Sequence, residues 1–232
     1  MNSKINILFI LLFFTSITNC KNEEYKVCIN QSPDIKIKLY NELTDQLICN
    51  NFFDEYYLGE KKYFDSLRVT SLKNDDEKYD KERVKAHNLL FNNKNKFCVL
   101  YIDSVNIKNT DIAEYSNESK INLIERNKHL FKNFSNSINI LKNLSLRSSV
   151  KANQFNQCTV KVLDIENKSK NEKECEAGIV YFSEIVFDNT KKNALVFVNY
   201  RNKQRDFRNY IIKLTLVNDY WQADDEILLA IS

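Results

Sequence analysis

Glycine and proline are almost absent from this 232-residue chain, which holds two Gly and one Pro. A loop that cradles a phosphate or a dinucleotide needs several closely spaced glycines, so their scarcity excludes P-loops and dinucleotide-binding turns. Asparagine is abundant and takes over turn positions, since its side chain tolerates left-handed backbone and bonds locally. The composition therefore argues against nucleotide-binding enzymes.

Metal ligands in the usual spacings are also missing. Six Cys and two His are present, but no Cys-x-x-Cys pair occurs and no His lies near a Cys, so a zinc site is not expected. His87 and His129 lack the spacing of a Ser-His-Asp or Cys-His arrangement. The formal net charge is only +3, and nucleic-acid binding needs a concentrated basic face. We therefore expect no metal, no cofactor and no nucleic acid.

The chain has one long apolar run, and it stands at the N-terminus. Residues 5–14 follow Lys4 and precede a short polar exit, which is the three-part layout of a secretory signal peptide. A membrane-spanning helix needs about 20 apolar residues, so this run is too short, and no later stretch approaches that length. We therefore expect residues 1–19 to be a signal peptide and the protein to be exported.

The signal ends in Ile17-Thr18-Asn19-Cys20, which resembles the lipobox of bacterial lipoproteins. In that family the cysteine receives a diacylglyceryl group and becomes the new N-terminus, although Asn19 stands where Gly, Ala or Ser is usual. The resemblance implies lipidation of Cys20, a tether over residues 20–31, and attachment to the cell membrane or the outer membrane. Secretion, with Cys20 in a disulfide, is the alternative.

An odd number of cysteines follows Cys20. At least one thiol is therefore free or paired outside the chain, unless Cys20 is not lipidated and makes a sixth. The sequence leaves the pairing open among Cys28, Cys49, Cys98, Cys158 and Cys175.

Residues 32–232 are expected to form one α+β domain, with a helical part over residues 32–145. Ser32-Pro33-Asp34 predicts a helix start with the Ser32 hydroxyl as N-cap. Apolar residues then recur at three- and four-residue steps, and Gly59 stands where a left-handed residue ends a helix. Further helices are predicted at 84–91 and, in two pieces, at 117–145.

The C-terminal part, residues 157–230, is predicted to be a β-meander. Asp188-Asn189 and Asn218-Asp219 stand where hairpin turns are needed, and residues 97–103 form an earlier buried strand. Alternation in residues 212–217 predicts one packed and one wet face of the sheet, with the helices covering its apolar face. The five strands of the meander are expected at 159–165, 179–187, 194–200, 210–217 and 220–229.

Residues 180–225 resemble the ending of a group of uncharacterised flavobacterial lipoproteins of the Bacteroidetes. The likeness lies in the strand pair 182–188 and 193–198 and in the close Asn218-Asp219-Tyr220-Trp221. Many of those proteins carry Gly and Cys after the second strand, where this chain has residues 201–205 instead. The close is also similar to NTF2-like and cystatin-like domains, in which a helix packs on a curved sheet. Neither resemblance brings a catalytic residue.

A basic hairpin tip is the first candidate for an interaction site. It consists of Arg201, Lys203, Arg205 and Arg208. Arginine offers a planar fork of donors, so this tip could receive an acidic protein partner, a lipid headgroup or a glycan carboxylate. A solvated turn is the alternative.

Two carboxylates in the last strand are a second candidate. Strand alternation is expected to send Asp224 and Glu226 to the same side, where they could bind a cation or act as acid and base. The alternative is the wet face of an edge strand, which discourages aggregation.

These patterns together predict a cell-envelope lipoprotein with a non-enzymatic binding or structural role, held at the membrane by its lipid. One alternative is an immunity-type protein that sequesters a toxin in a tight one-to-one complex. The other is a small hydrolase or isomerase on an NTF2-like sheet. That alternative predicts a cavity holding at least two of His87, Asp103, Asp224 and Glu226.

Overall fold

The structure is a computed structural model, and it describes residues 32–48, 81, 98–102, 108–134, 137–157, 160–166, 176–202 and 208–231. These residues form a seven-stranded mixed sheet with the order β2-β1-β3-β5-β6-β7, and β4 pairs with β5 off this path. The strands are β1 (Cys98–Tyr101), β2 (Lys161–Asp164), β3 (Glu176–Phe182), β4 (Val186–Phe187), β5 (Asn193–Asn202), β6 (Arg208–Val217) and β7 (Tyr220–Ile231).

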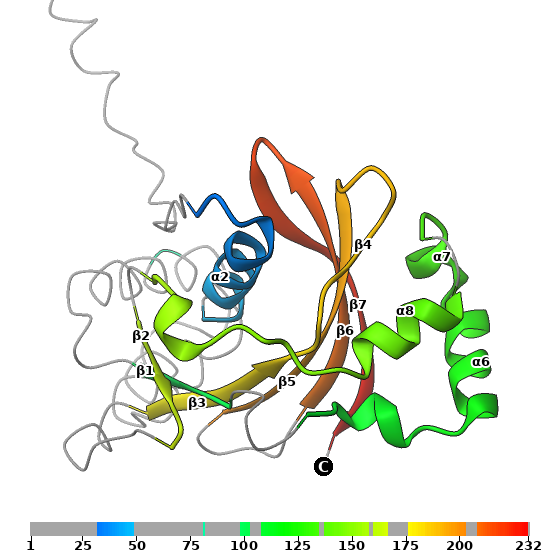
Figure 1. Cartoon of the computed structure of the whole chain (residues 1–232), viewed down its shortest axis with the longest axis horizontal. Helices are drawn as coiled ribbons and strands as arrows, with labels where there is room; N and C mark the ends of the chain where they lie inside the picture. Colours follow the sequence, from blue (N-terminus) through cyan, green and yellow to red (C-terminus); the bar gives the residue numbers. More distant parts are fainter. Residues whose placement is uncertain are drawn as a thin grey trace, which may run out of the picture.

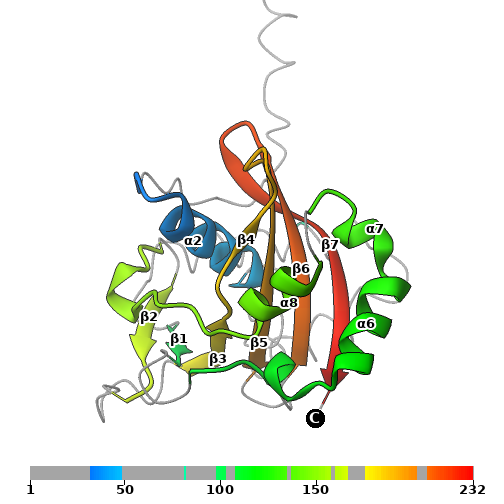
Figure 2. The same ribbon diagram turned by 45° about the vertical axis from the view of Figure 1, so that its right-hand side comes forward.

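Helices cover both faces of this sheet. In Figures 1 and 2 the sheet stands between α2 on one side and the helices α6 to α8 on the other. The helices are α2 (Ile35–Leu47), η2 (Asp111–Glu114), α6 (Asn117–Arg126), α7 (Lys128–Phe131), α8 (Ser137–Leu144) and η3 (Ala152–Gln154).

The predicted α+β fold with a C-terminal antiparallel meander is confirmed. Strands β3, β5, β6 and β7 pair in antiparallel order. The strand predicted to open the meander, 159–165, is instead β2, which is parallel to β1 and ends the sheet on the other side. Strand β1, from the mainly helical part of the chain, lies between β2 and β3 and is parallel to both. Parallel strands are joined by long crossover connections. No local turn signal in the sequence therefore predicts the pairing of β1 with β2 and β3.

The sheet has an apolar core on each of its two faces. In β5, Val196 and Val198 pack toward α2, whereas Leu195 and Phe197 pack toward α8 and its neighbours. The prediction of one wet face is therefore wrong for the centre of the sheet. In β6, Ile211 is fully buried under the helices, because the helical segment after β1 crosses back over this face.

The hairpin between β6 and β7 has the predicted two-residue turn. Asn218 and Asp219 have φ values of 50° and 62°, which is the left-handed pair that suits the twist of such hairpins. The connection from β4 to β5 is organised differently. Its positive φ, 54°, belongs to Lys191, and the Asp188 carboxylate accepts hydrogen bonds from the backbone nitrogens of Lys192 and Asn193 at 3.0 and 3.2 Å.

The first helix begins later than predicted. Asp34 has extended backbone and is the N-cap, because its Oδ1 accepts from the backbone nitrogens of Lys36 and Ile37. The Ser32 hydroxyl accepts only from the nitrogen of Asp34, so the prediction of Ser32 as N-cap is wrong. The helical region over residues 117–145 has three pieces, not two. The predictions at Gly59 and residues 84–91 lie outside the described residues.

Candidate functional site

The two described members of the predicted basic tip point to opposite faces of the sheet. Arg208 stands directly opposite Tyr200, so these two side chains share a face. Arg201 follows Tyr200 in β5 and therefore points to the other face. Lys203 and Arg205 lie outside the described residues. The sheet thus does not gather Arg201 and Arg208 into one basic surface.

A β-bulge separates the two carboxylates of β7. The register with β6 shifts next to Lys213, so Asp224 and Asp225 together stand against that one residue. Asp224 Oδ2 lies 2.8 Å from Lys213 Nζ. Glu226 stands opposite Ile212, which packs toward α2 on the other face. The prediction that Asp224 and Glu226 share a side is wrong, because the bulge breaks the alternation.

The histidine and cysteine candidates do not form a site in the described part of the chain. His129 Nε2 lies 3.2 Å from Asp225 Oδ2 in an exposed pair, and such surface pairs contribute little to stability. His87, Asp103 and Cys20 lie outside the described residues. Within the described ranges, no three His, Cys, Asp or Glu side chains are grouped to hold a metal ion.

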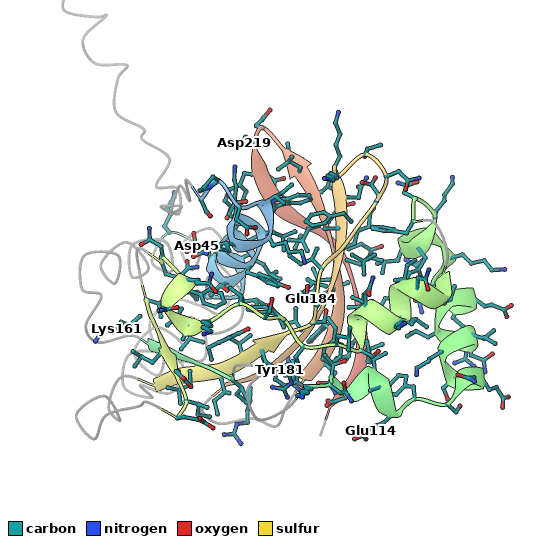
Figure 3. All side chains as sticks on the ribbon, in the orientation of Figure 1. Asp45, Glu114, Lys161, Tyr181, Glu184 and Asp219 are labelled. Atoms are coloured by element: carbon teal, nitrogen blue, oxygen red, sulfur yellow. The ribbon has the colours of Figure 1, made fainter. Side chains whose placement is uncertain are left out.

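A buried polar cluster that no sequence pattern predicts lies on the sheet face toward η2. The hydroxyl of Tyr181, labelled in Figure 3, donates to Asp111 Oδ1 at 3.0 Å. Asn209 Nδ2 donates to Asp111 Oδ2 at 2.7 Å, and Asn199 Nδ2 donates to Asn209 Oδ1. Burial, followed by the nearby Asp111 charge, raises the pKa of Tyr181. The Asp111 carboxylate therefore holds η2 against β3 and β6.

Arg147 completes this polar cluster. Its guanidinium carbon lies 3.5 Å from the centre of the Tyr181 ring, and its Nε donates to the Asn109 carbonyl at 3.2 Å. Burial lowers the pKa of Arg147, and the Tyr181 and Asp111 groups oppose that effect. Two buried atoms, Arg147 Nη1 and Asn199 Oδ1, have no hydrogen-bond partner among the residues that the structure describes. Because most of the other polar groups bind one another, we interpret the cluster as a structural clamp.

Helix α2 covers the first part of the outer edge of β7. Glu42 Oε2 accepts from the Trp221 nitrogen at 2.8 Å. Gln46 donates to the Trp221 carbonyl at 2.7 Å and accepts from the Ala223 nitrogen at 2.8 Å. Unpaired edge groups attract other strands, so these two side chains close the edge near the hairpin.

The Glu42 carboxyl is buried, and burial disfavours its charged form. Its residue is only 2% exposed, and burial raises its pKa to about 7, against the opposing effects of the Trp221 hydrogen bond and the nearby Lys38 charge. Lys38 itself pairs with Asp219 at 2.8 Å, and Figure 3 shows Asp219 at the tip of the β6–β7 hairpin. The edge cover therefore includes a group that titrates near neutral pH.

Replacing Glu42 with glutamine should stabilise the protein at pH 8 and change it little at pH 4.5. Between the ordinary pKa of 4.5 and the raised value of about 7, the unfolded state loses its proton first, so stability falls as pH rises. Glutamine keeps the acceptor and removes this loss. The expected gain is about 1–2 kcal/mol, after discounting the full shift for solvent screening. Thermal unfolding at both pH values measures it.

The matched control is Glu118→Gln on the exposed surface of α6. It should leave the pH dependence of unfolding unchanged. An equal effect of Glu42→Gln at both pH values would contradict the assignment.

Among the described residues, no strand pairs with the outer edge of the C-terminal part of β7. Trp221 and Ala223 turn their nitrogens outward to α2, and after the bulge the Glu226 nitrogen is outward and bonds its neighbour Asp225 Oδ1 at 2.9 Å. Outward groups alternate along an antiparallel strand, so the nitrogen and carbonyl of Leu228 are the next outward pair. No other group covers Leu228 in the described part of the chain, and the residue is 47% exposed.

A groove of about 390 Å³ lies beside this open edge. Its other wall is α6, which presents Ser119, Asn122, Leu123 and Arg126 at helical spacing. The lining residues include no acid, and Arg126 forms no ion pair with any residue that the structure describes. The groove therefore offers backbone groups, side-chain amides and one unneutralised cation.

Sequence patterns could not have located this groove. The β7 edge is exposed by its place at the end of the sheet order, and α6 reaches it through a tertiary contact. Only the helical spacing of Leu123 and Arg126 was visible, and the same spacing is usual for any surface helix.

Comparisons with known proteins give no relative. No family model, no curated protein and no solved structure matches the chain. Among the helices that the structure describes, none combines the length and the apolar character that crossing a membrane requires.

Proposed function

We propose that this chain is an exported lipoprotein of the cell envelope, and that its folded body binds an extended segment of another protein along the open edge of β7. The signal-like N-terminus and the lipobox-like Cys20 support the envelope location. The exposed Leu228, on the edge strand beside the α6 groove, supports the binding role.

Strand addition is the mode of binding that this edge favours. An added strand obtains its affinity from main-chain hydrogen bonds and its specificity from pockets for alternate side chains. Leu228 supplies one outward nitrogen and one outward carbonyl. Asn122 and Asn127 of the lining carry amides that both donate and accept, so they suit the polar main chain of a partner.

The charge of the groove limits the kind of segment that can bind in it. Arg126 is the cation of the lining, and no carboxylate lines the groove to neutralise it. A segment with an Asp or Glu opposite Arg126 would form a charge-assisted hydrogen bond. Glu42 and Gln46 close the edge at Trp221 and Ala223, so the added strand must be short.

An immunity-type role is the narrower form of this proposal. In that case the extended segment belongs to a toxin, and binding is tight and one-to-one. The hydrolase alternative gains no support from the described residues, because Asp224 and Glu226 face opposite sides of the sheet.

Leu228→Pro should abolish strand addition. Proline removes the outward nitrogen donor but is tolerated on an edge strand. The probe is a displayed library of random ten-residue peptides, selected on the full chain. Selected peptides should be extended and acidic, and their affinity for Leu228→Pro should fall roughly tenfold or more, because the main-chain bond and its neighbours are lost.

Leu228→Thr is the matched control, since it changes the same exposed side chain and keeps the nitrogen donor. Peptides should bind it within about twofold of the original chain, the change expected for a side chain that contributes little. Equal binding to the proline variant, or a selection that enriches no peptide, would refute the role of this edge.

A further inference from the structure

A second groove lies on the other side of α6, against α8. It has a volume of about 410 Å³, within the range of small-molecule sites. Helix α6 lines it with Lys120, Ile121 and Ile124, and α8 lines it with Leu141 and Lys142. The two α6 grooves use different faces of one helix, because residues 120, 121 and 124 share a face that residues 119, 122 and 126 do not.

The lining of this second groove is mainly aliphatic between its polar residues, which include Asn117 and Ser145. Leu141 is buried and Ile124 is half-buried, whereas Ile121 is 55% exposed. Leu123 and Ile124 of α6 pack partly against the core beneath, whereas Ile121 is left largely in solvent. Covering Ile121 and the apolar strip beside it with a hydrocarbon chain would be favourable, at about 25 cal/mol for each Å² removed from water.

Two lysines also line this groove. Lys120 and Lys142 form no ion pair with any residue that the structure describes, and no acid lines the groove. The surrounding segment, residues 117–145, holds five Lys or Arg and two Glu. An apolar strip with unneutralised cations in the same lining complements a molecule that has a hydrocarbon chain and an anionic head.

We propose that the α6–α8 groove binds a free long-chain fatty acid. The acyl chain lies on Ile121, Ile124 and Leu141, and the carboxylate lies between the ammonium groups of Lys120 and Lys142. A groove between two helices encloses a single chain, whereas a membrane surface would favour a convex apolar face. This site is separate from the β7 edge, so either proposal stands without the other.

Photocrosslinking in membranes tests this site with the full chain in place. The probe is a fatty acid with a diazirine at the end of its chain, and mass spectrometry maps the crosslinked peptides. Crosslinks are expected in α6 and α8. Excess dodecanoate should compete roughly tenfold better than dodecanol, which has the same chain without the charge, because the lysines recognise the carboxylate.

The double variant Lys120→Glu/Lys142→Glu should lower the crosslink yield in α6 and α8 roughly tenfold, since it replaces attraction by repulsion in the groove. Lys128→Glu/Lys132→Glu, which changes two exposed lysines outside the groove, should keep the original yield. Because three of the positions are exposed and Lys120 is half-buried, loss of folding is not expected. Equal competition by dodecanol, an unchanged yield in the double variant, or crosslinks confined to other segments would each overturn the proposal.

Discussion

Replacing Trp221 with alanine should unfold much of the protein at 37 °C. Trp221 is the largest fully buried side chain, with 0% exposure, and its ring lies 5.8 Å from that of Phe187. Removing a buried tryptophan costs about 3–5 kcal/mol, a large fraction of the 5–15 kcal/mol that stabilises a typical domain. Glu42 and Gln46 bond the backbone nitrogen and carbonyl of residue 221, which alanine keeps, so the loss should come from packing alone. Denaturant unfolding followed by circular dichroism measures it.

Trp221→Phe is the matched variant that isolates packing from hydrogen bonding. The indole nitrogen is buried without a hydrogen-bond partner in the described part of the chain, so phenylalanine removes an unsatisfied donor along with some volume. We expect this variant to lose less than about 1.5 kcal/mol, because an unpaired buried polar group is itself costly. A loss as large as that of Trp221→Ala would mean that the nitrogen has a partner in solution.

Replacing Cys20 with serine should abolish incorporation of labelled palmitate. If Cys20 is the lipidated residue of a lipoprotein, the change removes the only thiol at the lipobox-like site, so the effect is complete rather than graded. The measurement is palmitate labelling of the full chain expressed in a bacterium that processes lipoproteins. Globomycin, which blocks the lipoprotein signal peptidase, should make the longer precursor accumulate.

Cys28→Ser is the control for this experiment, since Cys28 lies a few residues beyond the lipobox-like motif. It should retain full labelling. An original chain that takes up no palmitate and is released in soluble form would refute the anchor and favour secretion, with Cys20 in a disulfide.

The C-terminal half of the fold was predictable because its signals are local. Asn218 and Asp219 specify the last hairpin through their tolerance of positive φ, and the apolar runs of β5 and β6 stand where expected. The position of β1 was not predictable. Its apolar composition marks a buried strand, but no local signal identifies β2 and β3 as its parallel neighbours.

The candidate site, like the fold, could be predicted only where its signals are local. Asp224 and Glu226 were assigned to one side by simple alternation, and a single inserted residue in β7 reversed that result. Asp111, Arg147 and Asn209 come together from three distant segments, and each is an ordinary polar residue in its own neighbourhood. Residue spacing predicts one strand or one helix at a time. Each groove beside α6 is formed by two elements together, so residue spacing does not predict it.

The contacts between α2 and β7 have a consequence for the order of folding. Glu42 and Trp221 are 179 residues apart in the chain, and Gln46 and Ala223 are 177 apart. Closing such a long loop costs entropy before any contact repays it, and chains rich in distant contacts fold slowly. The edge of β7 near its hairpin thus stays uncovered until both ends of the chain are free to meet.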